Sequence, residues 1–165
     1  MTILHLTDPA RSDVPVTRMV FPDGQPHVSI DPDVLMRTID AKGPLEVVTA
    51  LTSALDFVTT ALALDAIVAA FVAKGRVPDV ALNISFMLGA RMDRRIAPGQ
   101  PATLHVLASM LAPVTRTLRA LRILDPHSPV TLETIAGATA LHPDALVAFA
   151  LGDLARGGES RAVVI

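Results

Sequence analysis

Residues 43–86 read GPLEVVTALTSALDFVTTALALDAIVAAFVAKGRVPDVALNISF, an apolar stretch that begins with glycine and proline. Gly43-Pro44 predicts the start of a helix, because proline is tolerated at an early helical position. Apolar side chains then recur at the helical spacing of three or four residues, namely Val48, Leu51, Leu55, Val58 and Leu62. Gly75 stands where a helix commonly ends, and residues 80–86 predict a buried strand. A long helix followed by a buried strand indicates an α/β protein.

The same alternation continues along the chain. Extended segments are predicted at residues 3–6, 14–20, 28–30, 34–39, 121–124 and 161–165, and further helices at residues 104–111 and 144–154. Strands that alternate with helices predict a parallel sheet covered on both faces. We therefore expect a three-layer, doubly wound, mainly parallel sheet.

The composition favours one domain with its own core and no membrane segment. A chain of 165 residues suits one domain. Hydrophobic residues make up 51% of the chain, yet Asp56 and Asp65 interrupt its most apolar stretch, residues 47–72, so no uncharged run reaches the ~18 residues that a span needs. We expect that stretch to be a buried helix.

Charge, cysteine content and the N-terminus narrow the function classes. The net charge is −2 and no basic tract is present, which argues against nucleic-acid binding. No cysteine is present, which excludes disulfides and thiolate metal sites. The N-terminus lacks the pattern of a secretory signal, so we expect a cytoplasmic location.

The loop at residues 88–101 is rich in glycine, proline and arginine. It follows a predicted strand, and ligands of doubly wound sheets gather at the carboxyl ends of strands. The guanidinium groups of Arg91, Arg94 and Arg95 match phosphate oxygens, and Asp93 can hold an arginine in position. A solvated loop whose charges pair locally is the alternative, because a basic loop alone is weak evidence for a ligand.

Asp125-Pro126-His127-Ser128 follows another predicted strand. A carboxylate and an imidazole two residues apart could share a divalent ion, and Mg²⁺ commonly takes few protein ligands together with substrate phosphates. A histidine that bonds a neighbouring carbonyl is the commoner case. The segment Phe21-Pro22-Asp23-Gly24-Gln25, taken by itself, predicts only a turn.

Together these three segments resemble the nucleotide- and metal-binding segments of the ribose-phosphate pyrophosphokinase, or phosphoribosyl pyrophosphate synthase, family. Their order and spacing agree over nearly the whole chain. The resemblance implies a phosphoribosyltransferase-like fold and a homo-oligomer. In that family the segment that matches residues 21–25 is a hairpin, which reaches a neighbouring subunit and contacts adenine there. The nucleotide-binding residues that the resemblance implies are Phe21, Asp23, Gly24, Gln25, Arg91, Met92, Asp93 and Arg94.

Two substitutions depart from the family's pattern. Gln25 replaces a usual Glu, and its amide can still accept a hydrogen bond from the base. Met92 replaces the Gln of the family's Arg-Gln-Asp-Arg, which exchanges a polar contact for a softer packing surface. The resemblance also implies that Asp125 and His127 hold Mg²⁺, together with an Asp that would follow Ile165.

The family's reaction transfers diphosphate from Mg-ATP to ribose 5-phosphate. Its phosphoribosyl-binding loop and catalytic flap belong to a second domain, so no catalytic residue is assigned here. We expect residues 1–158 to form the nucleotide-binding domain and residues 159–165 to begin a second one. A sugar phosphate would then bind only with that second domain, and this chain alone would be inactive.

Two alternatives stay open. The chain could be a non-catalytic regulatory or assembly paralogue of the same family. It could also be a doubly wound domain that binds some other phosphate compound, since fold does not fix function.

Overall fold

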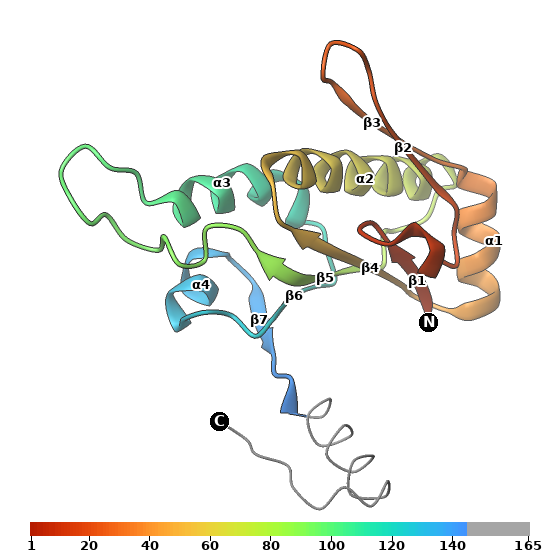
Figure 1. Cartoon of the computed structure of the whole chain (residues 1–165). Helices are drawn as coiled ribbons and strands as arrows, with labels where there is room; N and C mark the ends of the chain where they lie inside the picture. Colours follow the sequence, from red (N-terminus) through yellow and green to blue (C-terminus); the bar gives the residue numbers. More distant parts are fainter. Residues whose placement is uncertain (145–165) are drawn as a thin grey trace, which may run out of the picture.

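The fold is organised around a parallel sheet of five strands in the order β1-β4-β5-β6-β7 (Figure 1). A computed structural model of the chain describes residues 1–144. The strands of the sheet are β1 (Thr2–His5), β4 (Leu45–Leu51), β5 (Val80–Met87), β6 (Ala120–Leu124) and β7 (Ala138–Leu141). The other elements are the 3₁₀ helix η1 (Pro9–Arg11), the antiparallel hairpin β2 (Val16–Val20) and β3 (Pro26–Ile30), and the helices α1 (Pro32–Lys42), α2 (Ala54–Ala73), α3 (Thr103–Thr115) and α4 (Pro129–Thr134). The predicted α/β fold on a mainly parallel sheet is confirmed.

The spatial order of the described strands follows their order in the chain. Right-handed crossovers that advance in one direction place their helices on one face of a sheet, and α1, α2, α3 and α4 indeed contact one another in series. The buried face of β4 meets α2, where Thr49 Oγ1 lies 3.2 Å from Thr60 Oγ1. Residues on the opposite face, such as Val48 and Asn83, are half-buried. Because the strands are parallel, all five end at one edge of the sheet. Within residues 1–144 the helices lie on one face, so the predicted covering of both faces by a doubly wound sheet is not observed there.

Helix α2 is the central helix of the core. Its N-terminus is a capping box, in which Ser53 and Asp56 each accept a hydrogen bond from the other's backbone. Side chains along its inner side, including Phe57, Leu64 and Phe71, are almost fully buried. Within residues 1–144 it is the one helix long and apolar enough to cross a membrane, judged by length and composition alone. Its packing between the sheet and the hairpin is that of a core helix, as predicted.

Two local predictions were wrong. Residues 45–51, which were expected to begin the long helix, form β4, because nearly every side chain of this run is buried as in a central parallel strand. Gly43 ends α1 instead of opening a helix, with its N–H donating to Ile39 O at 2.7 Å. Residues 34–39, expected to be extended, belong to α1, because the Asp31 carboxylate caps the N–H groups of the helix start at 2.8 and 3.1 Å.

The carboxyl half of the chain holds two elements that the pattern did not predict, α4 and β7. The helix predicted at residues 104–111 extends to Thr115, with Pro113 inside it. The helix predicted at residues 144–154, the strand at residues 161–165 and the boundary between residues 158 and 159 lie outside the described residues.

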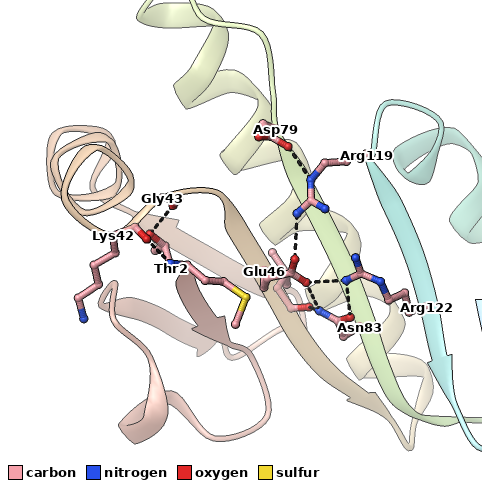
Figure 2. A network of polar contacts seen from close by, with 10 residues as sticks. Thr2, Lys42, Gly43, Glu46, Asp79, Asn83, Arg119 and Arg122 are labelled. Atoms are coloured by element: carbon pink, nitrogen blue, oxygen red, sulfur yellow. Dashed lines mark hydrogen bonds and ion pairs between the residues drawn. The ribbon is translucent and has the colours of Figure 1, made fainter. Parts of the chain in front are cut away.

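A polar network joins the amino-terminal halves of β4, β5 and β6 on the half-buried face (Figure 2). Glu46, only 8% exposed, accepts hydrogen bonds from Asn83 Nδ2 at 2.7 Å, Arg122 Nη1 at 2.8 Å and Arg119 Nη2 at 2.9 Å. Arg119 Nε also donates to Asp79 at 2.6 Å. Burial alone would raise the pKa of Glu46, but these three donors outweigh it and lower that pKa. The buried carboxylate is thus satisfied within the protein.

Candidate functional site

A cavity of about 760 Å³ opens at the carboxyl ends of β5 and β6. Its lining residues are Ser85, Phe86, Met87, Gly89, Ala90, Arg91, Met92, Ile123, Leu124, Asp125, Pro126, His127 and Pro143. Arg91 and Met92 come from the loop after β5, and Asp125 and His127 from the turn after β6. The structure therefore brings four of the predicted site residues together, at the edge where ligands of parallel sheets bind.

The part of the loop that carries Arg91 is held in place by its backbone. Met92 N donates to Gly89 O at 2.8 Å, and Met92 O accepts from Leu104 N at 3.1 Å. Gly89 has a φ of 78°, and a Cβ there would lie 3.1 Å from Leu107 Cδ1, so this turn requires glycine. The backbone next to Arg91 is therefore held in place by hydrogen bonds, and Arg91 lines the cavity.

Asp125 has an unusual backbone conformation. It is the single non-glycine residue within residues 1–144 with a positive φ, 45°. Its N–H donates to Leu141 O at 2.9 Å, which fixes the turn against β7. Residues held in this region cost free energy and cluster at functional sites. Asp125 and His127 both line the cavity and are both exposed to solvent.

These two side chains make a sparse set of metal donors. No cluster of three or more His, Asp or Glu side chains suited to a metal ion occurs in the described part of the chain. One carboxylate and one imidazole do not complete the shell of Mg²⁺, which takes six ligands and prefers oxygen. They fit Mg²⁺ as partial ligands when substrate phosphates supply further oxygens.

Asp93 lies beside the cavity but does not line it. Its carboxylate accepts a hydrogen bond from Ser128 Oγ at 3.0 Å, and its carbonyl lies 3.2 Å from His105 Nε2. Neither contact was predictable from local sequence patterns, because His105 and Ser128 are 12 and 35 residues away from Asp93 in the chain. The lining by Phe86 and Pro143 was also missed, although Phe86 could have been found as the last residue of the predicted strand.

The remaining arginines of the loop lie outside the cavity. Arg94 and Arg95 are exposed and belong to residues 94–101, which project away from the sheet between β5 and α3 (Figure 1). The sequence predicts the three arginines to be one cluster. All three are exposed, but only Arg91 lines the cavity.

Residues Phe21–Gln25 connect β2 to β3 and are all exposed. The turn is closed by Phe21 N donating to Gln25 O at 2.8 Å, and Gln25 N donates to Asp23 Oδ1 at 3.1 Å. Gly24 adopts a φ of 86°. The hairpin projects past α2, away from the loop at residues 88–101, and contributes nothing to the cavity of its own chain (Figure 1). Its role in a neighbouring subunit stays a prediction.

Comparisons with known proteins bear on the fold. No family model matches the chain, and neither does any curated protein. Among solved structures, the chain is similar to the crystal structure of phosphoribosylpyrophosphate synthetase from Mycobacterium smegmatis, with a TM-score of 0.62. The chain shares the fold of that synthetase. The match has 14% sequence identity and covers 89% of this chain and 46% of the synthetase chain.

An identity this low shows the fold alone, and the predicted phosphoribosyltransferase-like fold is confirmed. The chain spans less than half the length of the synthetase that it matches. The roles of the individual site residues remain predictions.

Proposed function

We propose that the cavity at the ends of β5 and β6 binds a magnesium nucleotide. In this proposal the chain is the nucleotide-binding part of a ribose-phosphate diphosphokinase, which transfers diphosphate from Mg-ATP to ribose 5-phosphate. The observation that carries the proposal is the meeting of Arg91 and Met92 with Asp125 and His127 in one cavity. These residues come from two separate segments that were singled out by sequence, on a fold shared with a phosphoribosylpyrophosphate synthetase.

The lining suits both parts of a nucleotide. Arg91 would form charge-assisted hydrogen bonds with phosphate oxygens. Phe86, Met92 and Pro126 form apolar walls against which a base could pack. Asp125 and His127 would be the residues that hold Mg²⁺, and the ion, when bound, would neutralise charge on the phosphates. The contribution of this chain is binding and orientation.

Two partners follow from the proposal. The hairpin lies outside the cavity of its own chain, so contact between the base and Phe21, Asp23 and Gln25 requires a second copy of the chain. The protein would then be a homo-oligomer. Its proposed location is the cytoplasm. A monomer in light scattering would contradict this shared site. The sugar phosphate would bind a second domain beyond residues 1–158. The 165-residue chain by itself should therefore not convert ATP and ribose 5-phosphate to products.

A regulatory or assembly paralogue is the second candidate. Met92 and Gln25 favour it, because each removes a polar or charged group that the enzyme family uses for the nucleotide. Such a paralogue should change the activity of a full-length synthetase when the two are mixed. The nucleotide-binding part of an enzyme should leave that activity unchanged.

Calorimetric titration of the 165-residue chain with Mg-ADP and, separately, with ribose 5-phosphate tests the proposal. We expect weak binding of the nucleotide and no binding of the sugar phosphate. An assay for AMP release from ATP plus ribose 5-phosphate should show no turnover. Absence of nucleotide binding would contradict the assignment, and AMP release would mean that the sugar site lies within this chain.

A further inference from the structure

If the arginine loop (residues 88–101) and the turn at residues 125–128 share a ligand, the distance between the two segments must stay constant. Ser128 precedes α4 at the position where a serine hydroxyl normally caps the first N–H groups of a helix. Its side chain makes no such cap. The hydroxyl donates instead to Asp93 Oδ2 in the arginine loop, at 3.0 Å. The serine therefore links two loops that follow different strands.

A second contact fixes the other side of Asp93. His105, in the first turn of α3, places Nε2 3.2 Å from Asp93 O. A carbonyl oxygen only accepts, so the contact requires the tautomer in which Nε2 carries the proton. Met92, the residue before Asp93, is already bonded to the backbone of Leu104. Asp93 is thus held by its side chain to the turn and by its backbone to α3.

We infer that Ser128, Asp93 and His105 form a clamp that sets the position of Arg91 relative to Asp125 and His127. Asp93 in this arrangement is a positioning residue: its carboxylate is bonded to Ser128 and does not line the cavity. The inference rests on the proposed function, since the site that the clamp positions is the nucleotide cavity. It gives Asp93 a different role from the direct nucleotide contact that the sequence resemblance implies.

Substitutions of the two bonded side chains test the clamp. Asp93→Ala and Ser128→Ala should each weaken Mg-ADP binding about fivefold to tenfold, as expected for a lost hydrogen bond. The double variant should bind no worse than the weaker single variant, because both changes break the same bond. Asp93→Asn should restore most of the affinity, since its amide oxygen still accepts from Ser128. Asp93→Asn binding as poorly as Asp93→Ala, or additive losses, would overturn the inference.

Hydrogen exchange of the free protein provides a readout that does not depend on the nucleotide. Ser128→Ala should speed exchange of the amides at residues 88–93, and Asp93→Asn should not. Ser109→Ala is the matched control, since it removes an α3 hydroxyl that bonds His105 O at 2.8 Å and not Asp93. Unchanged exchange in Ser128→Ala would refute the clamp. Faster exchange in Ser128→Ala, in a protein that binds no nucleotide, would instead contradict only the proposed function.

Discussion

Two groups of polar residues lie on the same sheet and differ in how their charges are satisfied. The Glu46 network, made of Glu46, Asp79, Asn83, Arg119 and Arg122, is closed by hydrogen bonds of 2.6–3.1 Å. The cavity cluster, made of Arg91, Asp125 and His127, makes no side-chain hydrogen bond or ion pair with residues 1–144. Both groups contain arginine and aspartate, so the presence of these charged residue types alone does not separate them.

The difference lies in where each group stands on the strands. Glu46 and Asn83 are inside strands, where an unpaired charge would be costly and partners from the neighbouring strands are within reach. The cavity cluster follows the ends of β5 and β6, where the chain leaves the sheet and side chains stay open to solvent. The first group is thus satisfied within the fold, and we propose that the second binds a ligand.

The largest effect is expected for Glu46→Ala. It leaves the half-buried Arg122 without its carboxylate, and should lower the free energy of unfolding by about 3 kcal/mol, the low end for breaking a buried ion pair. Urea denaturation measures this. The control is Asp40→Ala, which removes an exposed pair with Arg76 and should cost at most about 0.5 kcal/mol. Equal losses of unfolding free energy in the two variants would mean that the Glu46 network stabilises the fold no more than an exposed ion pair does.

Arg91→Ala should act on binding instead of stability. Loss of a charge-assisted contact should weaken Mg-ADP binding by about 1.5–3 kcal/mol. The free energy of unfolding should change by less than about 0.5 kcal/mol, because Arg91 is exposed. Calorimetry on Arg91→Ala is compared with Arg95→Ala, an exposed arginine of the same loop outside the cavity. If both variants bind alike, Arg91 has no special position.

A smaller effect is expected from pH. The pKa of Glu46 is held below its ordinary value of 4.5 in the folded protein. The ionised carboxylate therefore stabilises the fold at pH values above the unfolded pKa, and this stabilisation is lost as the pH falls through the lower folded pKa. Urea denaturation below about pH 5 should show a shallower decline for Glu46→Gln than for the wild type. Parallel declines would mean that other carboxylates account for the acid sensitivity.

The sequence predicted the carboxyl-end cluster for a general reason. Arg91 and Asp125 each follow a recognisable apolar strand, and parallel strands bring such segments to one edge. The boundary at β4 was not predictable from periodicity, because Val48, Leu51 and Leu55 keep helical spacing across a strand, a turn and a helix. The Ser53 and Asp56 capping box was the local signal that marked the true helix start.

The contacts that shape the site were beyond local patterns. Ser128 and Asp93 meet only because β5 and β6 are neighbours in the sheet. A single hydrogen bond between side chains far apart in the chain leaves no pattern in the sequence. The division of the arginines has the same origin: Arg91 lies in the part of the loop bonded to α3, and Arg94 and Arg95 lie in the part that projects.

The most direct test of the division between the two groups is an NMR titration of the ¹⁵N-labelled chain with Mg-ADP. The account predicts that amide shifts concentrate at residues 89–92 and at Leu124, Asp125 and His127, and that the amides of Glu46, Asn83 and Arg122 stay unchanged. Shifts centred on the Glu46 network, with none at the ends of β5 and β6, would contradict it.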